Sequence, residues 1–283
     1  MKNGKKIYDF AKELFPINRS ITGEGVRKTL NILKREIPEL NIKSISSGKK
    51  VFDWIVPKEW NINDAYIIDP SGKKFAEFKK NNLHVVGYSI PVNTTISKFE
   101  LEKHLYSLPK QPNAIPYVTS YYNKNWGFCL KHKDRTMLKN GTYKVMIDSS
   151  LKKGVLNYGE CIIKGKTKKE IFFSTYICHP SMANNEVSGP SVLCSLVRDC
   201  LKNIDNNYTY RIVFIPETIG AICYLQKNLV EMKKNIVAGF NISCVGDDKN
   251  YSLIKSRNGN TLADKLLQHV LKYSTKKFMT YEF

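Results

Sequence analysis

The residues best suited to chemistry follow three apolar stretches in the second half of the chain. The stretches cover 170–178, 210–215 and 237–245, and the strings after them are His179-Pro180-Ser181, Pro216-Glu217-Thr218 and Gly246-Asp247-Asp248. A histidine with oxygen ligands nearby suits a zinc ion. A glutamate at the next strand end suits a general base that takes a proton from water. Because ligands in open α/β sheets bind at the carboxyl ends of strands, the strings predict one shared site.

Each of these residues also has a structural interpretation, which the sequence leaves open. A single histidine such as His179 is more often structural than catalytic. Glu217 is equally suited to stabilise the start of the helix expected after it. Asp247 and Asp248 are typical of a solvated turn. The conjunction of polar groups at successive strand ends is what favours a site.

Other candidates lack partners at useful spacing. This holds for the remaining histidines, which are His84, His104, His132 and His269. Ser188-Gly189 lacks the Gly-x-Ser-x-Gly frame of a nucleophile elbow. Gly23 and Gly25 do not follow an expected strand, which argues against a phosphate loop. Arg19 beside them is a candidate for binding a substrate carboxylate.

The elements that must position the site alternate between strand and helix after residue 150. Helices are expected at 188–203, 219–232 and 260–273, between the apolar strands. This order predicts a parallel or mixed sheet with helices on its faces, an α/β fold. Helices at 6–15 and 24–36, the second capped by Thr22 and Gly23, precede it. The expected α/β domain therefore comprises 1–48 and 150–283.

Residues 49–149 show a different, mostly strand-like periodicity. Strands are expected at the positions 51–56, 65–69, 82–89, 117–122, 126–130 and 142–148. A short helix is expected at 100–108, and prolines at 109, 112 and 116 interrupt the chain after it. This pattern predicts an inserted β-rich domain.

The composition restricts the class of protein. The 283 residues carry 45 Lys and Arg against 25 Asp and Glu, a net charge of +20, but the lysines are scattered. A solvated basic surface is therefore favoured over nucleic-acid binding or an acidic ligand. No apolar run reaches the ~20 residues that span a bilayer, so no membrane partner is expected. Seven cysteines without a Cys-x-x-Cys pair predict reduced thiols in a cytoplasmic protein.

Several longer strings resemble the bacterial aminopeptidase-like proteins, known as domains of unknown function or as polysaccharide-biosynthesis proteins. The strings are Phe15-Pro-Ile-Asn-Arg-Ser-Ile-Thr-Gly-Glu-Gly-Val-Arg, Phe52-Asp-Trp-Ile-Val-Pro-Lys-Glu-Trp, Leu83-His-Val-Val-Gly-Tyr-Ser, Ile115-Pro-Tyr-Val-Thr-Ser-Tyr-Tyr, Cys178-His-Pro-Ser-Met-Ala-Asn-Asn-Glu and Pro216-Glu-Thr-Ile-Gly-Ala-Ile. The similarity runs from about residue 8 to the last residue. It implies a zinc-peptidase fold with a β module inserted near 50–150.

The resemblance also implies roles for individual residues, by a more distant likeness to di-zinc aminopeptidases. His179 matches the first metal ligand. Asn185 stands where those enzymes have a bridging aspartate, and Glu186 beside it is expected, with Arg19, to contact substrate. Glu217 matches the first residue of a Glu-Glu pair that supplies base and ligand, and Thr218 stands at the second.

Two further features of that family concern ligand positions that are altered in this chain or expected beyond its last residue. The next aspartate expected from the resemblance falls near Ser243 or Asp247, and the strand alignment favours Ser243. The later segments, a Ser-Asp-Glu-Arg-Gln-Tyr-like string and a distal histidine, would lie beyond Phe283. A chain truncated at its carboxyl end is therefore expected.

Three functions stay open on this basis. The first is a metal-dependent aminopeptidase-like hydrolase of amide bonds, with one or two zinc ions and a peptide or amino-sugar-like substrate, whose altered ligands leave activity open. The second is a non-catalytic binding or scaffold protein of the same fold in polysaccharide biosynthesis. The third is a basic nucleic-acid-binding protein. A homo-oligomer is compatible with each.

Overall fold

The apolar stretches of the second half form the centre of a five-stranded mixed sheet. The structure is a computed structural model that describes residues 2–275 and 277–283. The strand order is β1 (Asn41–Ser46), β10 (Val155–Ile163), β12 (Thr209–Ile215), β11 (Glu170–Tyr176) and β13 (Ile236–Asn241). β11 pairs in parallel with β12 and with β13, whereas β10 is antiparallel to β12. The parallel centre has the continuous apolar sequence expected of strands covered on both faces.

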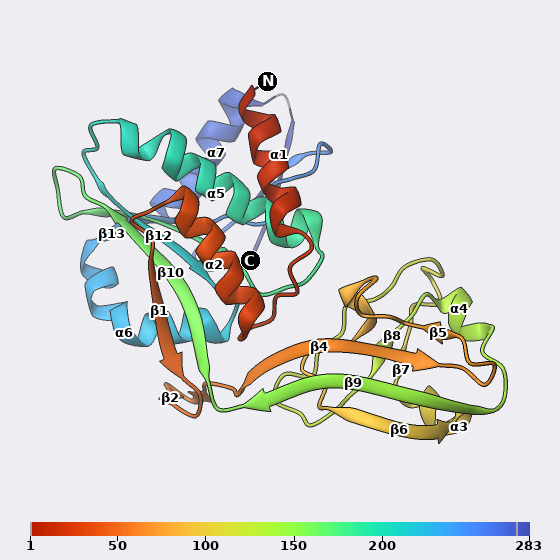
Figure 1. Cartoon of the computed structure of the whole chain (residues 1–283). Coiled ribbons are helices and arrows are strands. Elements are labelled where there is room, and N and C mark those ends of the chain that lie inside the picture. The colour runs from red at the N-terminus through yellow and green to blue at the C-terminus, as the bar shows by residue number, and fades with distance from the viewer. Residues whose placement is uncertain (1, 276) are drawn as a thin grey trace. The chain divides into compact units, whose positions relative to one another are not determined.

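Helices cover the two faces of this sheet. α1 (Lys2–Leu14), α2 (Glu24–Glu36) and α5 (Ser188–Asp199) share one apolar core with alternate side chains of β12, such as Ile212 and Phe214. Figure 1 shows α1 beside α5. The opposite side chains of the sheet meet α6 (Ile219–Asn235), where the Tyr224 ring contacts Tyr158 and Phe172. α7 (Leu262–Ser274) contacts β13 and follows a capping box at Thr261.

The chain divides into two compact units. Unit 1 comprises residues up to Ile17, Val26–Ser44 and Asn157–Phe283, and unit 2 comprises Asn18–Gly25 and Ile45–Leu156. Asn18–Gly25 lies in unit 2. The predicted domain limits stay a prediction.

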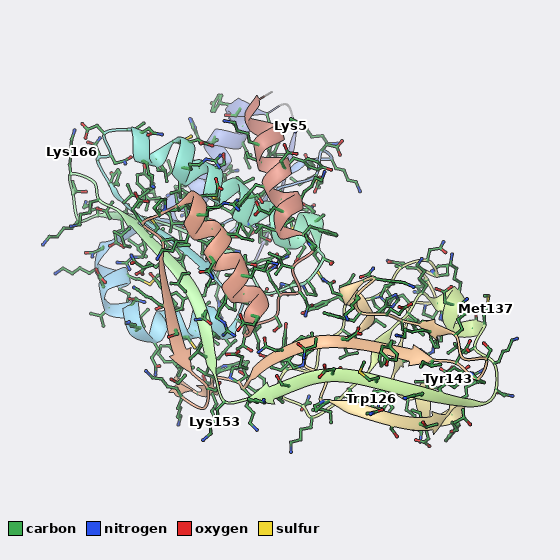
Figure 2. All side chains as sticks on the ribbon, in the orientation of Figure 1. Lys5, Trp126, Met137, Tyr143, Lys153 and Lys166 are labelled. Carbon is green, nitrogen blue, oxygen red and sulfur yellow. The ribbon has the colours of Figure 1, made fainter. Side chains whose placement is uncertain are left out.

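Unit 2 is built on a four-stranded antiparallel sheet. Its order is β5 (Lys74–Phe75), β4 (Glu59–Ile68), β9 (Thr142–Lys152) and β6 (Val92–Ser97). Its core includes the fully buried Tyr143, labelled in Figure 2, whose ring meets Phe75 edge-on. The smaller elements of both units are β2 (Lys50–Val51), β3 (Trp54–Ile55), η1 (Asn82–His84), α3 (Lys98–Glu102), β7 (Leu105–Tyr106), β8 (Phe128–Cys129), α4 (His132–Thr136), η2 (Ala183–Val187), η3 (Leu201–Asn203), β14 (Tyr251–Ile254) and β15 (Phe278–Tyr281).

Several sequence predictions in unit 2 are wrong. Residues 82–89 form the 3-10 helix η1 and two isolated bridges, from Val85 to Phe128 and from Gly87 to Thr119, rather than a strand. Residues 117–122 contribute the Thr119 side of the second bridge and no strand. The expected strand 51–56 is a tight hairpin of β2 and β3. Thr22 accepts a bond from the Trp60 amide, while Asn61 accepts one from the Glu24 amide at the start of α2. The first backbone amide of α2 therefore has its hydrogen-bond acceptor in β4.

No helix among the described residues is long and apolar enough to cross a membrane.

A buried ionic network links three strands of the unit 1 sheet. Arg211 of β12, 5% exposed at its side chain, bonds Glu170 of β11 at 2.6 Å and Glu160 of β10 at 3.1 Å. Lys43 and Tyr224 also bond Glu160. Burial alone would raise the pKa of Glu160, but these hydrogen bonds and the charge of Arg211 hold it below its ordinary value. The network compensates charges that would otherwise be costly beneath α6.

We predict that Arg211→Ala lowers the free energy of unfolding by about 3–5 kcal/mol. The reason is that it takes the arginine from the buried Glu170 and leaves Glu160 with Lys43 in place of two cations. The matched control is Arg35→Ala, since Arg35 pairs with Glu13 but is 54% exposed. There we expect a loss of about 0–1 kcal/mol. Urea unfolding at neutral pH measures both, and equal losses would contradict the assignment.

The lowered pKa of Glu160 also predicts a pH dependence. Its contribution to stability is fully present above its unfolded pKa of about 4.3 and is lost as the pH falls through the lower folded value. The difference in unfolding free energy between wild type and Glu160→Gln should therefore shrink on acidification. Urea titrations at neutral pH and at about pH 3.5 measure it. A difference that grows in acid would refute the shift.

Candidate metal site

The parallel register of β11 and β12 brings the first two polar strings together. Tyr176 and Ile215 are paired at the strand ends, and the Ile177 amide donates to the Ile215 carbonyl at 3.1 Å. His179 lies three residues beyond Tyr176, and Glu217 lies two residues beyond Ile215. Their side chains face each other, with Nε2 of His179 3.3 Å from Oε2 of Glu217. The imidazole is 12% exposed and the Glu217 side chain is 54% exposed, so the pair is open on the glutamate side.

Glu186 reaches the other nitrogen of the same imidazole. It lies in the π-helical turn η2 between β11 and α5, and its side chain is 1% exposed. Its Oε2 is 2.9 Å from His179 Nδ1, a normal hydrogen-bond length. A buried carboxylate on Nδ1 favours the tautomer with the proton on that nitrogen and leaves the Nε2 lone pair toward Glu217.

Cys178 is a part of the site but was not a sequence candidate for it. Its fully buried Sγ lies 3.4 Å from His179 Nδ1 and accepts a hydrogen bond from the Glu217 amide at 3.2 Å. Candidate ligand atoms of Cys178, His179 and Glu186 lie within 4.8 Å of one another. Because the 2.9 Å contact on Nδ1 is a hydrogen-bond length, we favour Nε2 as the metal-facing nitrogen. The position of Cys178 directly before the histidine was the available signal.

The turn after β12 explains how Glu217 reaches the histidine. Thr218, the N-cap of α6, has φ +56°, which is rare for a β-branched residue. This conformation turns the chain sharply between strand and helix. Glu217 lies before the N-cap and contacts His179. Strained backbone of this kind is common at functional sites.

The end of β11 and the segment after β13 together contribute a hydroxyl pair. Tyr176 Oη and Ser243 Oγ lie 2.6 Å apart, and the tyrosine ring meets His179 edge-on with centroids 5.5 Å apart. Burial raises the pKa of Tyr176 to about 12, although the Ser243 hydrogen bond opposes this. The phenol is therefore protonated at neutral pH. The resemblance places an expected aspartate at Ser243, whereas Tyr176 was not a sequence candidate.

The remaining candidates of this region contact other groups. Asn185 donates to Cys244 Sγ at 3.8 Å. Asp247 accepts from Asn184 Nδ2 at 2.8 Å, and the Gly246 amide donates to Asn184 Oδ1 at 2.7 Å. These bonds fasten the loop after β13 to η2. The predicted metal role of Asn185 stays a prediction.

Gly189 allows α5 to start close to the sheet. A Cβ at this position would lie 2.4 Å from the Ile242 carbonyl oxygen and 2.4 Å from Thr175 Oγ1. No side chain fits there without moving the backbone of the sheet. The glycine therefore keeps η2, and with it Glu186, against the ends of β11 and β13.

Arg19 and three histidines lie in unit 2. Arg19 is 1% exposed, and its predicted contact with substrate stays a prediction. His84 and His104 each bond a backbone carbonyl through Nδ1, and burial lowers the pKa of His84. His132 bonds Ser107 at 3.0 Å. These partners give each of the three histidines a structural role.

Comparison with known proteins shows the family of this chain. Residues 8–283 match the family described as "Domain of unknown function (DUF4910)". The chain belongs to this family. A Clostridium acetobutylicum relative, named for polysaccharide biosynthesis and an aminopeptidase-like domain, is 45% identical over 284 residues. The match covers 100% of this chain but 64% of that relative.

Solved structures show the fold of this DUF4910 chain. A Clostridium acetobutylicum protein solved as a candidate peptidase has TM-score 0.95 and 44% identity, covering 100% of this chain and 66% of that one. A zinc aminopeptidase from Bacillus subtilis has TM-score 0.67 at 12% identity, covering 99% and 78%. A peptidase M28 precursor from Shewanella amazonensis has TM-score 0.64 at 10% identity, covering 98% and 78%. The predicted aminopeptidase-like α/β fold is thus confirmed, as is the family resemblance.

The site of this DUF4910 member predicts a defined histidine tautomer. We expect the His179 proton on Nδ1, because the buried Glu186 carboxylate accepts it at 2.9 Å. The ¹⁵N chemical shifts of the His179 ring nitrogens, assigned by comparison with His179→Ala, measure this. Ring nitrogen shifts typical of a proton on Nε2 would contradict the geometry.

Proposed function

We propose that this chain carries the metal-binding part of an aminopeptidase-like hydrolase of amide bonds, with His179 and Glu217 holding a zinc ion. The supporting observation is the distance from His179 Nε2 to Glu217 Oε2, which is 3.3 Å. Two ligands at zinc bond lengths of about 2.0–2.1 Å and tetrahedral angles lie about 3.4 Å apart. The imidazole and carboxylate are therefore spaced as two ligands of one ion.

The donor set supports the same proposal. Imidazole nitrogen and carboxylate oxygen are common zinc ligands, and a carboxylate behind the histidine, here Glu186, is the usual outer partner. The amide of Asn185 at the bridging position favours one ion over two, because an amide compensates less charge than a carboxylate. Sharing a fold with proteins named zinc aminopeptidases adds to this support.

In this proposal each residue has a separate task. A zinc ion, when bound, supplies Lewis acidity toward a carbonyl oxygen and makes water a better nucleophile. Glu186 holds the imidazole in one tautomer and orientation. Glu217 lies at the open side of the pair, where it acts as a ligand or accepts a proton. The Tyr176 hydroxyl at the end of β11 bonds Ser243 after β13, beside the imidazole.

The substrate and setting follow from the same proposal. We propose a peptide, or an amide of an amino sugar, as substrate, and a single zinc as the cofactor. No disulfide joins any of the seven cysteines in the described part of the chain, which supports a reducing compartment such as the cytoplasm. A homo-oligomer is compatible with this proposal, and solution scattering would measure the oligomeric state.

Zinc binding tests the proposal directly. We expect the purified chain to bind zinc, and His179→Ala to weaken binding by on the order of 100-fold or more through loss of a ligand. Glu186→Gln should weaken it by about 10–100-fold, because only the outer partner changes. Competition titration with a chromogenic chelator measures the affinities.

His269→Ala is the matched control, because this exposed histidine of α7 contacts the Tyr273 ring instead. It should keep wild-type affinity, and circular dichroism checks that each variant is folded. Zinc affinity that is unchanged in His179→Ala would refute the proposed site.

A non-catalytic binding protein of the same fold is the second candidate. It is favoured by Thr218 and Asn185, which stand where the resemblance implies carboxylates. The name of the Clostridium relative supports a role in polysaccharide biosynthesis. Zinc binding without hydrolysis of aminoacyl substrates by that longer relative would favour this candidate over the hydrolase.

A further inference from the structure

A short hairpin of unit 2 exposes apolar side chains in series. It consists of β2 and β3. Val51, directly before the two-residue turn, and Val56, directly after β3, are each 1% exposed. Between them Phe52 is 47% exposed, Trp54 38% and Ile55 55%. The two valines anchor the hairpin, so the three outer side chains are not needed for its core. Large apolar groups gathered in this way mark interaction sites.

The backbone at Phe52 gives an independent sign of function. Its φ is +51°, in the left-handed region that favours glycine and asparagine in two-residue hairpin turns. An aromatic residue is strained there. Its exposed ring gains little packing energy in return, so the fold does not account for the choice of residue. Local conflicts of this kind are expected at functional sites.

A neighbouring tyrosine enlarges the apolar surface and holds it rigid. The Tyr122 hydroxyl donates to the Ile55 carbonyl at 2.9 Å, and its ring lies 6.1 Å from Trp54, inclined at 58°. Tyr122 is 50% exposed. We call Phe52, Trp54, Ile55 and Tyr122 the hairpin patch. The patch is preformed, because its outer ring is fixed by a backbone hydrogen bond.

Exposed lysines surround the hairpin patch. Residues 48–59 contain three lysines, at 49, 50 and 58, and two acids, Asp53 and Glu59, of which Glu59 accepts a bond from the Val155 amide. Lys124 follows Tyr122 by two residues. The Ser47 amide donates to the Gly154 carbonyl at 2.9 Å, which brings the turn with Lys152 and Lys153 to the hairpin base. Figure 2 labels Lys153 in this turn. The patch is thus apolar at its centre and positively charged around it.

We propose that the hairpin patch docks this protein on an anionic membrane surface. Aromatic and aliphatic side chains flanked by lysines are typical of segments that lie in the lipid headgroup region. The lysines would contact anionic headgroups while the rings reach the acyl boundary. A peripheral contact of this kind needs no membrane-spanning helix. The expectation of no membrane partner was based on the lack of a spanning apolar run, and that lack does not bear on a peripheral contact.

Other occupants fit the observations less well. The centres of protein–protein interfaces are depleted in lysine, whereas lysines surround this patch closely. Single-stranded nucleic acid stacks on aromatic rings, but the Trp54 and Tyr122 rings are inclined at 58° and Ile55 offers no ring. Charge and apolar composition together therefore favour the lipid surface.

Vesicle co-sedimentation tests the proposal. We expect the chain to bind vesicles of phosphatidylcholine with one third phosphatidylglycerol, and to bind pure phosphatidylcholine far more weakly. Added salt should weaken the binding, because it screens the lysines. Trp54→Ala should reduce binding about tenfold, and each of Lys49→Gln and Lys50→Gln about fivefold, the value of one lysine near an anionic surface.

Phe52→Asn distinguishes a role of the Phe52 ring in vesicle binding from a role in hairpin stability. Asparagine tolerates the left-handed backbone, so we expect an unchanged or higher melting temperature together with about tenfold weaker vesicle binding. Phe99→Ala is the matched control, since Phe99 is 74% exposed beside Lys103 in the same unit. It should leave vesicle binding unchanged.

Three results would overturn the proposal. The first is equal binding to neutral and anionic vesicles. The second is a loss of binding in Phe99→Ala as large as in Trp54→Ala. The third is the absence of vesicle binding by the wild-type chain. The patch then serves another partner, whether or not the chain binds a single-stranded oligonucleotide.

Discussion

The in-register parallel pairing of β11 with β12 is the constraint on which the candidate site depends. Because Tyr176 and Ile215 end their strands at one level, the residues that follow are delivered to the same edge of the sheet. His179 and Glu217 lie 38 positions apart in the sequence, yet they face each other without any long loop to guide them. A one-residue shift of this register would turn the two side chains to different faces.

The interior of the sheet maintains that register in two ways. One is apolar packing of β12 against α1, α2 and α5. The other is Arg211, which bonds carboxylates on the strands at both sides of β12. An ionic network of this kind tolerates fewer alternative registers than apolar contacts do, since each charge has to meet its partner. The opposite face of the sheet thus bears on the geometry of the site.

The parallel strands were predictable from the sequence, because a continuous apolar run of this length between polar strings is typical of a strand buried on both faces. Prediction failed where buried apolar residues pair through single bridges rather than along a strand. Val85 forms one bridge to Phe128, the Val86 amide donates to the Gly127 carbonyl, and the left-handed Tyr88 ends any extended run. β14 and β15 were missed because their pairing joins distant segments, and neither has a pattern of its own. At the site, strand ends were enough to select His179 and Glu217, whereas the hydroxyl pair Tyr176–Ser243 depends on three-dimensional neighbours.

The π-helical turn η2 has a consequence for how such proteins are aligned. Both the Glu186 and the Val187 amides donate to the Met182 carbonyl, so the turn contains one residue more than an α-helical turn would. That extra residue decides which of two adjacent side chains faces the imidazole, and here it is Glu186 rather than Asn185. A column-by-column alignment matches Asn185 to a ligand, but the backbone presents its neighbour. Positions at this turn therefore have to be compared in space as well as by sequence column.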